Sequence, residues 1–388
     1  MQVTAAEIWH ALNQGEFRFF YQPKVSFLTG QVSGAEALIR WQRDERTIVP
    51  PDAFIPVALA HGLVPEITQS MFPRLVEDFQ RIRGVNAATT VALNVTAQDL
   101  DTPRLLALVR AAVAGGAISS SQLEIEITES ETVSGSEMTT RCLHALIGEG
   151  VQLSMDDYGT GYSSLDSLNR LPFDAIKMDQ SFVLRMLRSP KSAILVKTSI
   201  AMAQLLGLRT VVEGIESEDV YRTLLHYGCD EGQGYWISPP RPLAEFLALL
   251  DANPRWASSP VGMLRMAQLT HSWQLKLLMD TLLDYLQGGP PAAKGGVPEA
   301  LHIGHQDCAL GQWFYGPGKA LAGHPDFAVL EAPHRALHDF CGELLAEIAG
   351  GLDPSALRAR LLELSDRSAE LGAALQRLET RLLLAELG

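Results

Sequence analysis

Short apolar runs alternate with helical stretches through the first 250 residues, and this alternation constrains the fold more than any other feature. The runs carry β-branched or aromatic residues, and several are apolar throughout, as strands buried on both faces are. Repeated βα units predict a mostly parallel sheet. Eight such runs predict an α/β fold, a TIM-like (β/α)8 barrel. They lie at 17–23, 34–41, 90–95, 123–128, 151–157, 174–178, 209–214 and 228–237.

The composition changes near residue 250. Residues 251–261 are rich in Pro, Ser and Asn, which is typical of a linker, and helical patterns without strand signals follow them. A Gly/Pro-rich segment at 287–298 interrupts these helices. The sequence therefore predicts a barrel at 1–250, a linker at 251–261 and an all-α domain at 262–388.

The last predicted helix carries a seam of residues at alternating spacings of four and three. Such a heptad seam suits either a helical bundle or a dimer contact. Its members are Leu357, Leu361, Leu364, Ser368, Leu371, Leu375, Leu378 and Leu382.

The charge balance excludes several kinds of partner. With 31 basic and 45 acidic residues the net charge is −14, which argues against binding to a nucleic-acid polymer or an anionic membrane. Four cysteines are too few for a disulfide scaffold and fit a reducing compartment. No signal peptide or membrane-crossing stretch is recognisable, so we expect a soluble cytoplasmic protein without membrane insertion.

Acidic and amide side chains fall at or near the carboxyl ends of the predicted strands, where barrel enzymes build their active sites. One acidic residue in a strand is commonly half of an ion pair, but repetition at successive strand ends favours a metal site. Oxygen ligands suit Mg²⁺ or Mn²⁺, and two such ions can activate water and clamp a phosphate. The pattern predicts a metal-dependent enzyme acting on phosphate and leaves the substrate open. The principal residues are Glu36, Asn94, Glu126, Glu129, Asp156, Asp157, Lys177, Asp179, Glu213 and Glu216.

From about residue 7 to residue 250 the chain resembles the EAL domain, the cyclic di-GMP phosphodiesterase barrel. The order and spacing of the motifs make this resemblance specific. A departure is Tyr158, which replaces the usual Phe of one loop. The motifs are Tyr21-Gln22-Pro23, Glu36-Ala37-Leu38, Leu93-Asn94-Val95, Glu126-Ile127-Thr128-Glu129, 156–164, 177–182, 213–216 and Gln233-Gly234-Tyr235.

The resemblance implies a role for each matching residue. Lys177, Glu213 and Glu36 would be catalytic, with Lys177 holding either the attacking water or a metal-bound oxygen. Glu129 would support the 156–164 loop, and Gln22, Arg40 and Gln233 would contact the substrate. The implied reaction is hydrolysis of cyclic di-GMP to linear pGpG by water activated by two Mg²⁺ or Mn²⁺ ions. The implied metal ligands are Glu36, Asn94, Glu126, Asp156, Asp157 and Glu213.

Histidines are concentrated in the last third of the chain. His334 and His338 are four residues apart, so they share one helix face and can chelate one ion. Together with the HSW motif at 271–273 and the CALGQW motif at 308–313, they resemble the CZB domain, a zinc-binding four-helix bundle first described in chemoreceptors. The resemblance covers about 266–348 and implies one Zn²⁺ held by His271, Cys308, His334 and His338, a tetrahedral set.

We expect no ligand role for two tryptophans of these motifs, for three further histidines or for the other three cysteines. We expect Trp273 and Trp313 to be core aromatics, and surface or loop positions for His302, His305 and His324. Cys142, Cys229 and Cys341 are expected to be small buried residues.

These observations favour a cyclic di-GMP phosphodiesterase that is regulated by a C-terminal sensor of zinc alone or of zinc and redox state. The alternative is a non-catalytic cyclic di-GMP receptor that relays zinc or redox state to a partner. In a third interpretation the second domain serves only dimerisation, for which the leucine seam would suffice. A homodimer is expected in either case.

Overall fold

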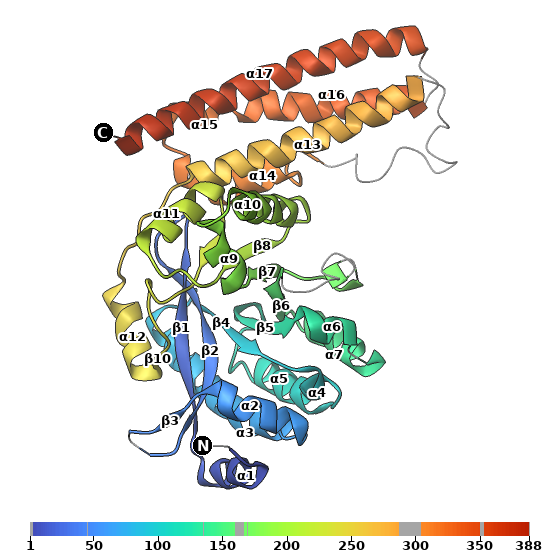
Figure 1. Cartoon of the computed structure of the whole chain (residues 1–388). Coiled ribbons are helices and arrows are strands. Elements are labelled where there is room, and N and C mark those ends of the chain that lie inside the picture. Colours follow the sequence, from blue (N-terminus) through green and yellow to red (C-terminus); the bar gives the residue numbers. More distant parts are fainter. Residues whose placement is uncertain are drawn as a thin grey trace. The chain divides into compact units, whose positions relative to one another are not determined.

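The computed structural model of the chain describes residues 3–44, 46–134, 136–159, 167–168, 170–286, 304–349 and 353–387. The described chain forms two compact units (Figure 1), and each is described by itself. The first unit comprises Met1–Thr198, Leu208–Thr223 and Cys229–Ser258. The second comprises Ser199–Gly207, Leu224–Gly228 and Ser259–Gly388.

The first unit contains a closed barrel, which confirms the predicted fold class. Its ring runs β1–β2–β4–β5–β6–β7–β8–β9 and closes from β9 back to β1. The short strands β3 (Ile48–Val49) and β10 (Arg241–Pro242) pair with β2 and β1 outside the ring. The ring strands are β1 (Phe17–Ser26), β2 (Val32–Gln42), β4 (Thr90–Asn94), β5 (Leu123–Thr128), β6 (Gln152–Tyr158), β7 (Ala175–Met178), β8 (Arg209–Val212) and β9 (Glu231–Gly232).

The first strand departs from the regular (β/α)8 pattern. β1 is antiparallel to both β2 and β9, whereas the pairs from β2 through β9 are parallel. Only residues 27–31 separate β1 from β2, and so short a connection permits a hairpin but not a parallel crossover. The register pairs Gln22 with Glu36 and Lys24 with Gly34, so the inward face of β1 lies beside that of β2.

Helices follow most of the strands along the chain. The Thr4 hydroxyl accepts a hydrogen bond from the Glu7 amide, and the Glu7 carboxylate accepts one from the Thr4 amide. These two bonds form a capping box at the start of the first helix. Asp179 has a comparable role: its side chain accepts the Ser181 amide at 2.9 Å and caps the helix after β7. The helices are α1 (Ala5–Gln14), α2 (Pro51–Ala60), α3 (Val64–Val85), α4 (Ala97–Leu100), α5 (Arg104–Ala114), α6 (Glu129–Ser134), α7 (Glu137–Gly148), α9 (Gln180–Met186), α10 (Pro190–Leu205), α11 (Glu218–Tyr227) and α12 (Leu243–Ala252).

In the second unit the helices α13, α16 and α17 lie side by side (Figure 1). α13 packs against α14 and α17, and α17 packs against α16. The predicted linker falls where α12 ends at Ala252 and α13 begins at Val261. The elements are α13 (Val261–Leu286), α14 (Ala309–Tyr315), the 3₁₀ helix η4 (Pro317–Leu321), α15 (Pro325–Ala328), α16 (Glu331–Ala349) and α17 (Pro354–Leu387).

The leucine seam of α17 is used within the chain. Leu357, Leu364 and Leu378 are fully buried, and the other leucines of the seam are buried as well. Their partners are the neighbouring helices of the same unit. The leucine seam is therefore part of the core of this unit, and it is not an exposed face that could form a dimer contact.

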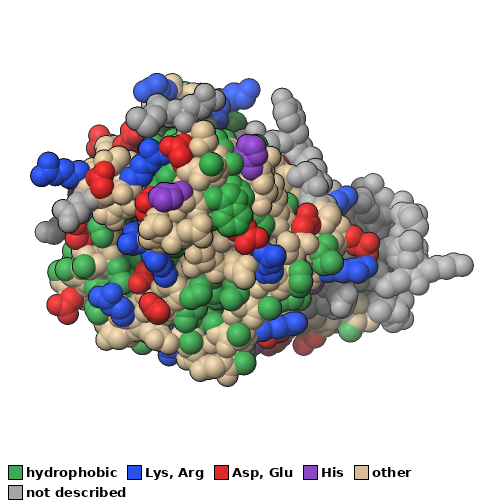
Figure 2. All heavy atoms as spheres, turned by 90° about the horizontal axis from the view of Figure 1, so that it is seen from below, with side chains coloured by type: hydrophobic (Ala, Val, Ile, Leu, Met, Phe, Trp, Pro, Cys, Tyr) green, Lys and Arg blue, Asp and Glu red, His purple; other side chains and the backbone are tan. Residues whose placement is uncertain are grey.

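The surface has a mixed character on the face shown in Figure 2, where Lys and Arg side chains are interspersed with Asp and Glu. The excess of acidic residues is thus not gathered into one region of this face. Among the described helices, none has both the length and the apolarity needed to span a bilayer.

Candidate active site and zinc centre

The predicted barrel residues lie on neighbouring strands. Glu36 is on β2, Asn94 ends β4, Glu126 is on β5, Asp156 and Asp157 are on β6, Lys177 is on β7, and Glu213 follows β8. Because these strands are parallel, their carboxyl ends meet at one end of the barrel. The register places Asn94 beside Glu126 and Thr128 beside Asp156, which brings side chains distant in sequence together.

The Lys177 ammonium is the meeting point of four carboxylates. Its Nζ lies 2.7 Å from Glu126 Oε2 and 2.8 Å from Glu213 Oε1. It also lies 3.2 Å from Asp156 Oδ1 and 3.5 Å from Glu36 Oε2. These contacts, which outweigh the opposing effect of burial, raise the pKa of Lys177 well above its usual value, so the group stays cationic.

We call Lys177 and its four carboxylate partners the hub. Glu36 connects this hub to the residues predicted to contact the substrate. Asn94 Nδ2 donates to Glu36 Oε1 at 2.5 Å, and Gln233 Nε2 donates to Glu36 Oε2 at 2.6 Å. Gln233 Nε2 also donates to Gln22 Oε1 at 3.0 Å, and both glutamines are buried. Four predicted site residues, from β1, β2, β4 and the segment after β9, thus hold one another in place.

Burial and neighbouring charges shift the pKa values of the carboxyl groups in the hub in different directions. Burial raises the pKa of Glu36, but Lys177 and the two amide donors outweigh it and lower this pKa to about 2. Burial raises the pKa of Glu126 against the opposing effect of Lys177 and Lys24, and it raises the pKa of Glu213 to about 7. Burial and the neighbouring Asp156 also raise the pKa of Asp157. Such divergence among adjacent acids is typical of functional sites.

The donor set suits a hard divalent cation. Glu36, Glu126, Asp156 and Glu213 offer carboxylate oxygens, and Asn94 retains its amide oxygen while Nδ2 donates to Glu36. Bringing these acids together in a buried place is costly, and Lys177 offsets only part of their charge. The residues therefore fit Mg²⁺ or Mn²⁺.

Asp157 adopts an unusual backbone conformation at the end of β6. Its φ is +58°, in the left-handed region that L-residues seldom occupy, and its amide donates to Asp156 Oδ1 at 2.9 Å. Strain of this kind is concentrated at functional sites. Tyr158, the substitution for Phe, is buried. The predicted support of the 156–164 loop by the buried Glu129 largely concerns residues 160–164, which lie outside the described residues.

Arg40 is four residues beyond Glu36 on β2 and therefore shares its face of the strand. Its Nη1 donates to the Ile39 carbonyl at 2.9 Å, and burial lowers the pKa of this half-buried guanidinium. Beside it lies a mainly apolar cavity of about 230 Å³, whose lining includes Arg40, Asn94 and Thr96. An open space thus adjoins two of the predicted site residues.

Sequence reasoning missed Lys24, Glu124 and Arg209. Lys24 is 1% exposed, and its Nζ lies 2.7 Å from Glu126 Oε1 and 3.2 Å from Glu124 Oε1. Arg209 Nη2 lies 3.3 Å from Glu124 Oε2. A signal was present, because Lys24 follows Gln22 by two residues and Glu124 precedes Glu126 by two, which places each pair on one strand face.

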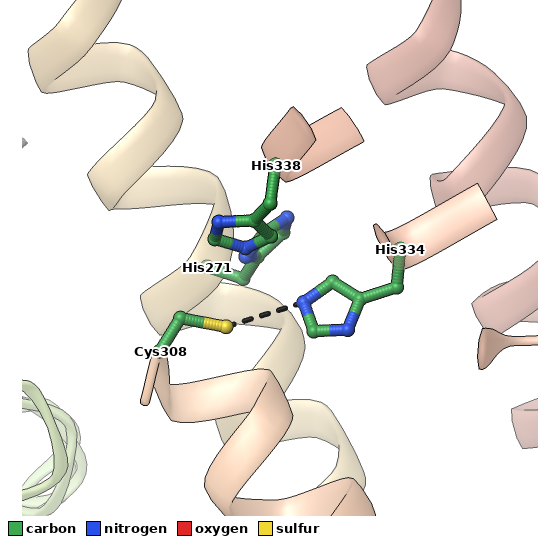
Figure 3. A group of neighbouring side chains, drawn as sticks. All are labelled: His271, Cys308, His334 and His338. Atoms are coloured by element: carbon green, nitrogen blue, oxygen red, sulfur yellow. Dashed lines mark hydrogen bonds between the residues drawn. The ribbon is translucent and has the colours of Figure 1, made fainter. Parts of the chain in front are cut away.

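In the second unit, the four predicted zinc ligands come together (Figure 3). His271 lies on α13, Cys308 precedes α14, and His334 and His338 lie on α16. Their ligand atoms lie within 4.8 Å of one another, and Cys308 Sγ is 3.2 Å from His334 Nε2. The four side chains point toward a common centre in Figure 3.

The chemistry of this cluster fits a metal. Burial lowers the pKa of His271 to about 4 and that of His334 to about 3, so both rings are neutral at pH 7. Both ring nitrogens of the buried His271 lack a hydrogen-bond partner in the described structure. Buried polar atoms usually have partners, and a zinc ion would supply one here.

The remaining predictions for this unit have mixed outcomes. Trp313 is buried as expected, but Trp273 is 61% exposed, so its assignment to the core is wrong. Both are on helices, and only the packing partners decide which face is covered. His324 accepts the Asp326 amide and caps α15, and the His305 ring is 6.4 Å from that of His334. His302 lies outside the described residues. Cys341 in this unit, and Cys142 and Cys229 in the first unit, are buried and unpaired, as predicted.

Comparison with known proteins finds a family model for each of the two parts of the chain. The EAL domain model matches residues 5–240, and the chemoreceptor zinc-binding domain model matches residues 277–345. The second match includes Cys308, His334 and His338, whereas His271 lies just before it.

Curated relatives match the barrel part of the chain. The cyclic di-GMP phosphodiesterase RocR of Pseudomonas aeruginosa is 34% identical over 244 residues, which cover 63% of this chain and 62% of that protein. The cyclic di-GMP phosphodiesterase PdeR of Escherichia coli is 33% identical over 236 residues, covering 61% of this chain and 36% of that one. The chain thus spans less than two thirds of the length of these relatives.

Solved structures resemble the same part. A complex of the PaMucR phosphodiesterase with c-di-GMP has a TM-score of 0.57 and 31% identity, covering 62% of this chain and 98% of that one. The EAL enzyme Bd1971, bound to cAMP and cyclic di-GMP, has a TM-score of 0.60 and 27% identity, covering 63% and 67%. Residues 277–345 match the chemoreceptor zinc-binding domain model, and because the EAL model matches more than half of its residues, the chain belongs to the EAL domain family.

Proposed function

We propose that this chain hydrolyses cyclic di-GMP to linear pGpG at the mouth of the barrel, in a reaction that depends on two Mg²⁺ or Mn²⁺ ions. The observation that carries the proposal is the convergence of Glu36, Glu126, Asp156 and Glu213 on Lys177. The phosphodiesterase names of the relatives RocR and PdeR support the choice of substrate.

The metal site would consist of oxygen donors from β2, β4, β5 and β6 and from the end of β8. When bound, the two ions would lower the pKa of a water molecule and neutralise charge on the phosphate. The ligands would be Glu36, Asn94, Glu126, Asp156, Asp157 and Glu213.

The chain's own groups complete the reaction site. Lys177 stays cationic and holds the attacking water, and it balances the negative charge that develops at phosphorus. Arg40 can bind a phosphate through two parallel N–H donors. Gln22 and Gln233 are already oriented by their contacts near Glu36 and would contact the substrate. Glu129 would support the loop after β6.

We further propose that one Zn²⁺ bound by His271, Cys308, His334 and His338 regulates this activity. A site with four protein ligands is closed, so zinc there would be structural or regulatory rather than catalytic. The ligands come from α13, from the residue before α14 and from α16, so zinc occupancy changes how firmly these elements are held together. Oxidation of the Cys308 thiolate by a peroxide would weaken the same site. We place the chain in a reducing compartment, the cytoplasm, and expect a homodimer.

The test is a turnover assay of the full chain with cyclic di-GMP and Mg²⁺ or Mn²⁺, in which pGpG is measured by chromatography. We expect turnover by the unsubstituted chain and by Glu245→Gln, an exposed control, and a loss of at least a hundredfold in Glu36→Gln. Tight binding of cyclic di-GMP without pGpG would instead support the receptor alternative.

The regulatory part has its own test in the same assay. Zinc chelation, zinc addition and a peroxide are applied separately, and both turnover and oligomeric state are measured. If none of the three changes either quantity, the zinc centre is structural only.

A further inference from the structure

A chain of alternating charges extends from the mouth of the barrel into its interior. It runs from Lys177 through Glu126, Lys24 and Glu124 to Arg209. Each of the three lysine–glutamate contacts joins side chains that are almost completely buried. The interior of such barrels is ordinarily filled by layers of branched apolar side chains. Burying a series of charged side chains there is costly, which suggests that the series has a function.

Glu126 is held from both sides. Lys177 Nζ lies 2.7 Å from its Oε2, and Lys24 Nζ lies 2.7 Å from its Oε1. A carboxylate with one ammonium group on each oxygen cannot turn about its last torsion without losing a charge-assisted contact. The plane of Glu126 is therefore determined by the two lysines together.

Lys24 is itself anchored on the side away from the mouth. Its Nζ lies 3.2 Å from Glu124 Oε1, and the other oxygen of Glu124 is 3.3 Å from Arg209 Nη2. Arg209 in turn contacts Glu231 at 3.2 Å and donates to Gln152 Oε1 at 2.9 Å. The position of the Lys24 ammonium is thus fixed by groups on β5, β6, β8 and β9.

From this geometry we propose that Lys24 is a positioning residue of the metal site, holding Oε1 of Glu126 so that Oε2 remains directed at the mouth. The inference rests on the proposed function, in which Glu126 is a metal ligand. Lys24 acts through Glu126, because Glu126 stands between it and Lys177. Groups that orient metal ligands in this way commonly contribute ten- to a hundredfold to metal affinity.

A purely structural role is the alternative, in which Lys24 only balances the charge of Glu124 and Glu126. The two roles make different predictions for a charge-balanced variant. Lys24→Met keeps the length of the side chain but leaves two buried carboxylates without their common cation, which is strongly destabilising. Adding Glu124→Gln removes one of these negative charges while the amide can still accept from Arg209.

Tyr21→Phe is a matched control on the same strand. The Tyr21 hydroxyl donates to Asp78 Oδ2 at 2.7 Å, and its ring stacks on Phe246 of α12. Tyr21 therefore lies on the outer face of β1, opposite to Lys24. Its variant loses one hydrogen bond of the strand without touching the interior series.

The experiment measures Mn²⁺ affinity, by the electron paramagnetic resonance of free Mn²⁺, and the midpoint of thermal unfolding of the zinc-loaded full chain. We expect Lys24→Met to lower both quantities. We expect Lys24→Met/Glu124→Gln to recover most of the midpoint while its Mn²⁺ affinity stays roughly ten- to a hundredfold weaker. Tyr21→Phe should lower the midpoint and leave Mn²⁺ affinity unchanged.

Two outcomes would overturn the inference, and they are distinguishable. If the unsubstituted chain binds Mn²⁺ and the double variant binds it equally well, Lys24 has only the structural role and the proposed function stands. If the unsubstituted chain binds no Mn²⁺, the metal site proposed for the barrel is wrong, and the inference fails with it.

Discussion

Lys177 Nζ lies 2.8 Å from Glu213 Oε1, a contact between two strands' ends that brings a fully buried cation to a carboxylate still partly open to solvent. In the proposed function, this pair joins the buried carboxylates around Lys177 to the place where a substrate phosphate would approach.

Replacing Lys177 by Met should remove the positive charge around which the four carboxylates gather. We expect kcat for cyclic di-GMP hydrolysis to fall at least a hundredfold, a usual loss when one charge-stabilising group is removed. Lys197→Met, at an exposed position, is the control and should keep normal kcat. Steady-state kinetics decide the matter, and retention of more than a tenth of the activity would contradict the role given to Lys177.

Arg40→Lys keeps the charge but loses the planar pair of donors. If Arg40 binds a substrate phosphate, KM should rise about tenfold with kcat within a few-fold, because a lysine contacts phosphate as a point charge. The exposed Arg46→Lys should leave both constants unchanged. A fall in kcat at constant KM would place Arg40 in the chemical step instead.

Cys308 and Cys341 are both buried in the second unit, but only Cys308 belongs to the four-residue cluster. We expect purified protein to contain one zinc per chain, Cys308→Ser to contain much less, and Cys341→Ser to retain it. Elemental analysis of the three proteins provides the measurement. Equal zinc content in all three would show that the metal binds elsewhere.

The partly buried Asp230 predicts a pH dependence of stability that is independent of both metal sites. Burial raises the pKa of Asp230 to about 6, from 3.8, although Thr210 donates to its carboxylate through its amide and its hydroxyl. Between these two values the folded state binds the proton that the unfolded state has lost. The free energy of unfolding should therefore decrease as the pH rises from about 4 to about 6, by roughly 3 kcal/mol in all.

Asp230→Asn isolates this contribution. The neutral amide keeps an acceptor for Thr210, so the decrease between pH 4 and pH 6 should become smaller. The exposed Asp219→Asn should leave it unchanged. Denaturant unfolding at several pH values tests this, and an identical pH dependence in Asp230→Asn and the unsubstituted chain would contradict it.

The α17 leucines predict a contrast between neighbouring positions. Leu364 is fully buried and Leu362 is 70% exposed. Leu364→Ala should lower the free energy of unfolding of the second unit by about 2–5 kcal/mol, and Leu362→Ala by well under 1 kcal/mol. Similar losses at both positions would mean that Leu362 is covered in solution, for example by a second copy of the chain.

Much of the barrel was predictable because its signals are local. Short apolar runs such as 123–128 became strands, and the acids at their ends, such as Glu126 and Asp156, were brought together by parallel pairing. The reversed direction of β1 was not predicted. Its reason is the five-residue connection to β2, which is too short for a parallel crossover.

Other features depend on contacts distant in sequence. Lys24 lies in an apolar run, but its partners Glu124 and Glu126 come a hundred residues later, so the sequence does not show that it is buried. The four zinc ligands were predicted through their resemblance to a family, since an isolated pair such as His334 and His338 is weak evidence. The exposed Trp273 shows that the covered face of a helix depends on its neighbours.

The antiparallel first strand has a consequence for how the barrel folds. β1 and β2 form a local hairpin, whereas closure of the ring requires Val25 to meet Gly232 across more than two hundred residues. Because contacts between distant residues form slowly, we expect ring closure to be a late event in folding. Gln233 reaches Gln22 and Glu36 only once the ring is closed, so a partly folded barrel would lack the complete site to which we assign the proposed hydrolysis of cyclic di-GMP.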